Sequence, residues 1–168
     1  FLFYWSTLLS NFVSKPFFKN IFILTKFIPE KLYKIFIKNM PIFCIDFLYE
    51  CEDEYLLLKR VEEPLKGQFW VPGGRLRLNE TIKDCVSRIQ EREIGRFIKE
   101  YEIIGFSNYF FEYSKNARAI HTPTLLFKIK TKTKFVPKLD NSHSDYIWTK
   151  NLPKEFIKKL VRFNQNEN

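Results

Sequence analysis

The residues best suited to chemistry lie together in the middle of the chain, where two glycines are followed by two arginines. Gly73 and Gly74 come directly after an apolar run that Pro72 ends, and Arg75 and Arg77 follow them. Adjacent glycines let the backbone approach a ligand closely, and an arginine guanidinium can bind two phosphate oxygens at once. With a carboxylate nearby, this loop could hold a diphosphate and a metal ion.

The carboxylate is expected on the helix that follows the loop. Thr81 and Asp84 form a capping-box pattern and Gly95 is typical of a helix end, so the sequence predicts a helix between them. At about 100° per residue, Glu93 falls on the apolar face of this helix, whereas Glu91 falls on the opposite, solvent-facing side. The apolar face itself consists of residues at helical spacing: Ile82, Cys85, Val86 and Ile89.

A carboxylate on a buried face needs a partner, because burying an unpaired charge is costly. Glu93 could find one in two ways. Arg88 and Arg92 flank the same face of the helix, so a salt bridge at the helix end is one interpretation. The other is a metal ion held between Glu93 and the glycine loop, which the arginines of that loop favour.

Three further polar residues are candidates for the site. Asp46 stands alone in an apolar stretch, where it is either the structural partner of a basic side chain or a site residue. Arg60 follows a predicted strand. His121 opens another strand beside a loop, and it is either a surface or structural residue or a group that exchanges protons near neutral pH. His143 is interpreted as an exposed residue.

A sheet must bring these residues together. Apolar runs bounded by turn residues predict strands at 42–49, 55–59, 69–71, 102–107, 122–130 and 143–148. Pro123 places its strand at a sheet edge or bulge. Helical spacing predicts a helix after Pro29 and another after Pro153. One face of the last helix is expected to carry Phe156, Ile157, Leu160 and Val161.

The composition limits the class of protein and its partners. At 168 residues and 45% hydrophobic content, the chain can bury the core of one domain. Its net charge is +9, but the lysines are scattered without a dense tract, so they fit a solvated surface or an anionic small substrate equally well, and no nucleic acid is expected. The three cysteines have no metal-site spacing and an odd count, which favours a reducing, cytoplasmic location.

Residues 1–28 form an apolar extension before the predicted domain at 29–168. The uncharged stretch Phe1–Val13 is shorter than the roughly 20 residues of a membrane-spanning helix. No basic segment precedes it, so a secretory signal is not expected. A membrane-surface anchor, a homodimerisation arm and a core-packing extension are all open interpretations.

The spacing of the central motif carries a family resemblance. Gly74 is followed after five residues by Glu80, after seven more by Arg88, and then by Glu93-Ile94-Gly95. This pattern resembles the Nudix box, whose members cleave nucleoside diphosphates linked to another group. The resemblance begins at Pro29, and it implies an α/β (α+β) fold, a Nudix-type α/β/α sandwich with a mixed β-sheet.

Two positions depart from the usual box. Ile89 and Arg92 stand where most Nudix enzymes carry metal-binding glutamates. A box reduced to its last glutamate, after Val-Pro-Gly-Gly-Arg, resembles the GDP-mannose mannosyl hydrolase branch. That branch implies hydrolysis of GDP-mannose to GDP and mannose, with water attacking the anomeric carbon.

The resemblance also implies roles for single residues. Mg²⁺, with Mn²⁺ as a second candidate, would lie between Glu93, the Gly73 carbonyl and the substrate diphosphate. His121 would be the general base that activates the water. The alternatives are a Nudix pyrophosphohydrolase that cleaves a P–O bond and a nucleotide-binding protein without catalysis.

The remaining candidates would bind the charged part of the substrate. Arg60 and Arg75 would share the charge of the leaving diphosphate, and Arg77 would add a substrate contact. Asp46 would line the same site.

Overall fold

The computed structural model describes residues 29–112 and 119–163, so the apolar extension at 1–28 lies outside the described residues. The chain divides into two units, residues 1–33 and 34–168, and the strands of the described residues all belong to the second. The helices are α3 (Glu30–Asn39), α4 (Ile82–Ile94) and α5 (Lys154–Lys159). The strands are β1 (Cys44–Cys51), β2 (Glu54–Arg60), β3 (Phe69–Trp70), β4 (Gly73–Arg75), β5 (Glu102–Glu112), β6 (Ala119–Lys130), β7 (His143–Thr149) and β8 (Leu160–Arg162).

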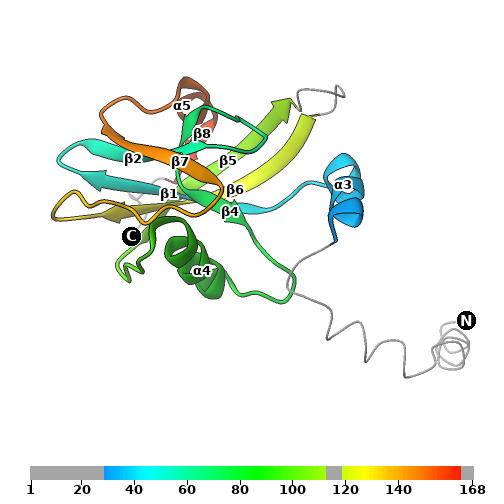
Figure 1. Ribbon diagram of the computed structural model, residues 1–168, viewed down its shortest axis with the longest axis horizontal. Coiled ribbons are helices and arrows are strands. Elements are labelled where there is room, and N and C mark those ends of the chain that lie inside the picture. Colours follow the sequence, from blue (N-terminus) through cyan, green and yellow to red (C-terminus); the bar gives the residue numbers. More distant parts are fainter. Residues whose placement is uncertain (1–28, 113–118, 164–168) are drawn as a thin grey trace, which may run out of the picture. The chain divides into compact units, whose positions relative to one another are not determined.

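The strands form one mixed, eight-stranded sheet with β1 near its middle (Figure 1). The main path is β3-β2-β1-β6-β5-β8, with β4 paired to β1 and β7 paired to β2. β1 and β6 run parallel, and every other pair is antiparallel. The mixed sheet expected from the sequence is confirmed. Within the described residues, no helix has both the length and the apolar character needed to cross a membrane.

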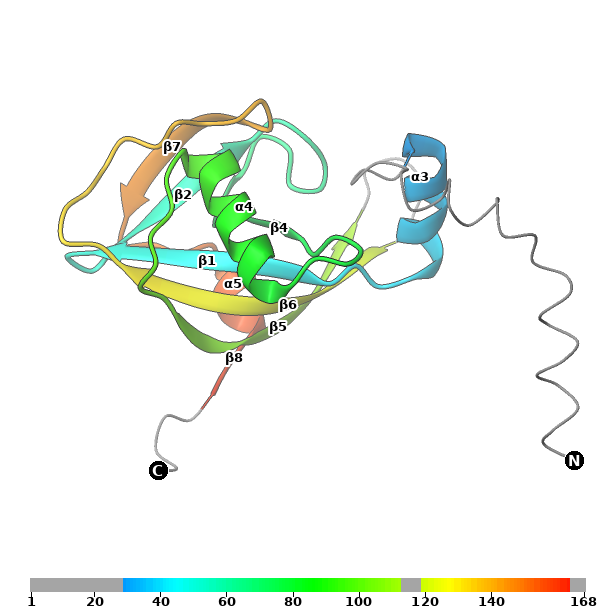
Figure 2. The same ribbon diagram turned by 90° about the horizontal axis from the view of Figure 1, so that it is seen from below.

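Helices α4 and α5 cover opposite faces of the sheet (Figure 2). Successive side chains of a strand point to opposite faces, and β1 follows this rule. Phe47 and its neighbours two residues away pack with Val86 and Ile89 of α4, whereas Leu48 packs with Phe156 of α5. Burial of these apolar side chains fixes α4, and thereby the candidate site, against the sheet.

Helix α4 forms where its sequence signals predict. The Thr81 hydroxyl caps the N-terminus by accepting a 3.2 Å hydrogen bond from the backbone N–H of Asp84. Gly95 ends the helix with a φ of 72°, the left-handed conformation that glycine adopts without strain. Glu93 is buried and Glu91 is exposed, as the helical periodicity predicts.

Two local predictions were wrong, and a third holds for one end of its strand. The segment Gly73–Arg75, interpreted as loop, is strand β4, because its backbone pairs with β1. Pro123 lies where β6 pairs with β5 alone, so this end of the strand is an edge on its β1 side, as the sequence predicts, although β6 further along lies between β1 and β5. The ladder between β6 and β1 begins only at Thr124, one residue beyond this proline. The terminal helix is shorter than predicted, because Leu160–Arg162 leave α5 and pair with the edge of β5.

Candidate active site

Glu93 is the buried carboxylate at the centre of the candidate site. Helix α4 holds it against β4, where its Oε2 accepts a 2.8 Å hydrogen bond from the backbone N–H of Gly73. Only 2% of Glu93 is exposed. Burial raises the pKa of this carboxyl, and the Arg92 guanidinium, which pairs with Oε1, opposes the rise. Of the two partners considered for Glu93, the structure therefore shows the salt bridge with an arginine at the helix end.

Asp46 also contacts Gly73, from strand β1. The two residues are register partners in β1 and β4, and a Cβ at Gly73 would overlap the Asp46 carboxylate. Only glycine therefore lets the two strands pair around this side chain. Burial and the nearby charge of Glu93 raise the pKa of Asp46 to about 7, against opposing contributions from a hydrogen bond to Trp70 and from Arg60.

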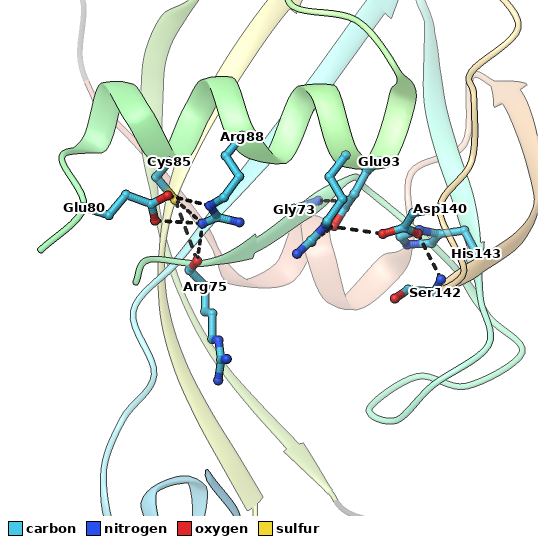
Figure 3. Close-up of polar contacts among 10 residues, drawn as sticks. Gly73, Arg75, Glu80, Cys85, Arg88, Glu93, Asp140, Ser142 and His143 are labelled. Carbon is cyan, nitrogen blue, oxygen red and sulfur yellow. Dashed lines mark hydrogen bonds and ion pairs between the residues drawn. The ribbon is translucent and has the colours of Figure 1, made fainter. Parts of the chain in front are cut away.

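A chain of polar contacts extends from Glu93 to β7 (Figure 3). The Nε of Arg92 lies 3.3 Å from Oδ2 of Asp140. Oδ1 of Asp140 lies 2.8 Å from Nδ1 of His143 and accepts a 3.0 Å hydrogen bond from the backbone N–H of Ser142. A carboxylate can only accept, so Nδ1 of His143 carries the hydrogen and Nε2 is left as the basic nitrogen. The chain joins a buried carboxylate to an oriented histidine.

His143 was predicted to be exposed, and this prediction was wrong. Only 8% of the residue is exposed, because β7 pairs with β2 and turns the side chain inward. In that ladder His143 is the register partner of Arg60. A protonated His143 would favour the charged form of Glu93 and lower its pKa, so the imidazole lies close to the site.

A second ion pair holds the loop between β4 and α4. Glu80 accepts hydrogen bonds from Arg88 at 2.5 Å and 2.8 Å, one to each carboxylate oxygen. The same carboxylate accepts the backbone N–H of Arg77, and Arg88 also donates to the carbonyl of Arg75 at 3.0 Å. The hydrogen bonds from Arg88 lower the pKa of Glu80 to about 2. Two of the motif residues thus position the backbone of the predicted phosphate loop.

The predicted substrate arginines lie in different surroundings. Arg60 donates from Nε to the carbonyl of Pro64 at 2.7 Å, and its charge acts on Asp46. The side chain of Arg75 points away from α4, as Figure 3 shows. Arg77 follows β4, with its backbone held by Glu80. Of the predicted set, Arg60 is therefore grouped with Asp46, Gly73 and Glu93.

His121 lies on the hairpin of β5 and β6. Its ring stacks on Phe110 with centroids 4.4 Å apart, and its Nε2 lies 2.5 Å from Oδ1 of Asn108. In the described parts of the chain, these contacts link His121 to β5, and none links it to Glu93 or Gly73. The histidine that the structure joins to Glu93 is His143.

The oxygen donors around Glu93 determine which kind of metal site is feasible. Within residues 29–112 and 119–163, no three His, Cys, Asp or Glu side chains are grouped as a metal cage. Mg²⁺ is commonly held by one or two carboxylates together with substrate phosphates. A buried carboxylate next to two glycines fits an ion that is shared with a diphosphate.

The comparison with known families decides the classification. Residues 40–156 match the NUDIX domain family, which is more than half of the chain. The chain belongs to the NUDIX family. Its NUDIX box carries Ile89 and Arg92 at two usual glutamate positions, and the structure places Ile89 in the hydrophobic core.

Two curated proteins are similar in sequence to part of this NUDIX protein. The low-salt glycan biosynthesis protein Agl8 of Haloferax volcanii is 30% identical over 87 residues, 52% of this chain and 56% of the relative. An ADP-ribose pyrophosphatase of Methanocaldococcus jannaschii is 32% identical over 75 residues, 45% of this chain and 43% of the relative. The matches thus span about half the length of these curated relatives.

The solved structures share the fold. The MutT protein of Methanosarcina mazei has a TM-score of 0.57 and 25% identity, over 71% of this chain and 91% of that one. A MutT NUDIX hydrolase of Burkholderia pseudomallei has a TM-score of 0.58 and 19% identity, over 69% and 89% of the two chains.

Proposed function

We propose that this NUDIX protein is a hydrolase of a nucleoside diphosphate linked to a sugar, and that GDP-mannose is cleaved to GDP and mannose. The observation that carries the proposal is the chain from Glu93 through Arg92 and Asp140 to His143. It offers one carboxylate for a metal and, on a different element, a separate oriented base. The name of the Haloferax relative, a glycan biosynthesis protein, supports a sugar-linked substrate.

The roles of the residues follow from their positions. A Mg²⁺ or Mn²⁺ ion bound by Glu93 and the Gly73 carbonyl would neutralise charge on the departing diphosphate. Arg60, Arg75 and Arg77 would bind the diphosphate oxygens. Asp46, buried beside Gly73 and Arg60, would meet the polar part of the substrate next to the glycine loop.

His143 is the base that this geometry favours. Its Nδ1 hydrogen is directed to Asp140, so Nε2 can accept a proton from water. The resemblance of the sequence instead assigns this role to His121, whose Nε2 lies against the amide oxygen of Asn108. An amide oxygen accepts a hydrogen bond, so this nitrogen carries the hydrogen and Nδ1 is the basic nitrogen of His121, which no contact of the described residues joins to Glu93. Separate substitution of each histidine distinguishes the two assignments.

One alternative function has a specific observation in its favour. The second curated relative is a pyrophosphatase of ADP-ribose, whose name denotes cleavage of the diphosphate. In that case water would attack phosphorus and release GMP and mannose phosphate from GDP-mannose. The alternative requires a metal-activated water, for which the site offers fewer carboxylates than the usual NUDIX box.

Hydrolysis in ¹⁸O-labelled water tests the proposal directly. With GDP-mannose and Mg²⁺, we expect the label in free mannose and unlabelled GDP as the other product. Glu93→Gln should greatly reduce this turnover, and the exposed Glu91→Gln should leave it nearly unchanged. Label in a phosphate would establish P–O cleavage, and no turnover of GDP-mannose or ADP-ribose would contradict both hydrolase functions.

The cellular location and the association of the protein are part of the same proposal. We infer a cytoplasmic location from the odd number of cysteines, all three of which are free in the structure. Homodimerisation and membrane-surface association through residues 1–28 stay predictions.

A further inference from the structure

Arg92 occupies an unusual position between two carboxylates. One of its terminal nitrogens pairs with Glu93 and its Nε pairs with Asp140 at 3.3 Å. The guanidinium also lies beside Gly74, because a Cβ at this glycine would be 3.2 Å from that terminal nitrogen. The cation therefore sits at the point where Glu93 meets β4.

The burial of Glu93 explains why a cation is needed at this point. Glu93 is 2% exposed, and an isolated charge at that depth would be strongly destabilising. Arginine remains protonated at any physiological pH, so Arg92 supplies a permanent counter-charge. It is also 40% exposed along its side chain, so it can leave Glu93 and reach solvent or a ligand.

We propose that Arg92 is the resident counter-cation of Glu93 in the free protein and that a divalent metal gains Glu93 only when an incoming diphosphate draws Arg92 away. A metal and a guanidinium compete for the same buried carboxylate, because placing both against it brings like charges together. A diphosphate relieves the competition, since arginine binds phosphate oxygens with two N–H groups. This inference rests on the proposed function, because it takes the ligand to be a nucleoside diphosphate.

The proposal gives Arg92 two measurable properties. In the free protein it suppresses binding of metal to Glu93, and with the nucleotide present it contributes to binding of the diphosphate. Both are equilibrium properties, so they can be measured without hydrolysis. They stay distinguishable from the proposed function, which fails only if the nucleotide sugar is not cleaved at its anomeric carbon.

Mn²⁺ titration of the full chain without nucleotide, followed by electron paramagnetic resonance of the free ion, tests the first property. We expect Arg92→Gln to bind Mn²⁺ at least roughly 10-fold more tightly than the natural protein, a difference of about 1.4 kcal/mol. The gain should disappear in the double variant Arg92→Gln/Glu93→Gln, which lacks the buried carboxylate. Lys83→Gln, which removes an exposed positive charge from the same helix, is the matched control for net charge and should bind Mn²⁺ like the natural protein.

The natural protein supplies a test that does not depend on the folding of Arg92→Gln. Without nucleotide, it should bind Mn²⁺ no more tightly than Glu93→Gln, because Arg92 already occupies the carboxylate. A natural protein that binds Mn²⁺ 10-fold more tightly than Glu93→Gln would overturn the proposal, as would an Arg92→Gln variant without any gain.

Calorimetric titration with GDP in the presence of a chelator tests the second property. We expect the affinity for GDP to fall roughly 10-fold in Arg92→Gln, because one arginine contact to the phosphates is lost. Unchanged affinity in this variant would show that the diphosphate does not engage Arg92 and would contradict that half of the proposal.

Discussion

His143 and Asp140 are joined by a 2.8 Å contact between Nδ1 and Oδ1, just where β7 begins. The contact orients the imidazole, and the same carboxylate is tied through Arg92 to Glu93 on α4. His143 of β7 is thereby coupled to Glu93, the last glutamate of the NUDIX box. Because these residues are far apart in the sequence, the sequence alone does not indicate that they are coupled.

The first prediction concerns the base. His143→Gln should lower kcat for GDP-mannose by roughly 10²–10⁴-fold, the usual range for loss of a positioned general base, while binding of GDP is retained. His121→Gln should have a much smaller effect, because the contacts of His121 are with β5. Steady-state kinetics of both variants measure this, and the reverse ranking would return the role to His121.

The second prediction concerns the pairing of β1 and β4. Gly73→Ala should destabilise the protein by several kcal/mol, because its Cβ would overlap Asp46 and lie 2.7 Å from the backbone oxygen of Ile45. Gly74→Ala is the matched control, since its nearest neighbour is the flexible end of Arg92 at 3.2 Å. Urea unfolding of both variants checks the difference, and equal losses would show that this contact does not limit the pairing.

The third prediction uses the ion pair of the loop. Glu80→Gln should destabilise the protein at pH 7 by about 1–3 kcal/mol, because Glu80 accepts hydrogen bonds from a charged partner. Its pKa is lowered from 4.5 to about 2 in the folded protein, so this contribution is present above about pH 4.5 and is lost as pH falls toward 2. Unfolding of the variant and the natural protein should therefore converge in acid. The exposed Glu91→Gln serves as the control.

The fourth prediction concerns Asp46. Its pKa is 3.8 in an ordinary environment, and burial and Glu93 raise it to about 7 in the folded protein. Between these values the folded protein keeps a proton that the unfolded chain has released, so Asp46 makes stability fall as pH rises from about 4 to about 7. Asp46→Asn should flatten this decline in chemical unfolding, whereas the exposed Asp145→Asn should not. An unchanged slope in Asp46→Asn would contradict the raised pKa.

Local sequence signals were enough to predict helix α4, which carries the carboxylate of the candidate site. The cap at Thr81, the stop at Gly95 and the periodicity between them located α4 and placed Glu93 on its buried face. These features depend on residues within a few positions of one another, and such interactions are recorded directly in the sequence.

The parts that could not be predicted depend on distant partners. Gly73–Arg75 becomes a strand only because β1 lies beside it, and His143 becomes buried only because β7 pairs with β2. The tie between Arg92 and Asp140 spans two elements, so no spacing within α4 indicates it. The NUDIX box could be recognised from its sequence pattern. The neighbours of its last glutamate, Glu93, are known only from the way the sheet is assembled.

The ion pair between Glu80 and Arg88 also restricts insertions and deletions in the segment between these two residues. Glu80 lies just before the cap of α4, and Arg88 reaches back to it from within the helix. One inserted or deleted residue between them would rotate the rest of the helix by about 100° and shift it by about 1.5 Å. Arg88 would lose Glu80, and Glu93 would at the same time turn away from Gly73. The length of this stretch is therefore fixed by two contacts at once, one at each end of the helix.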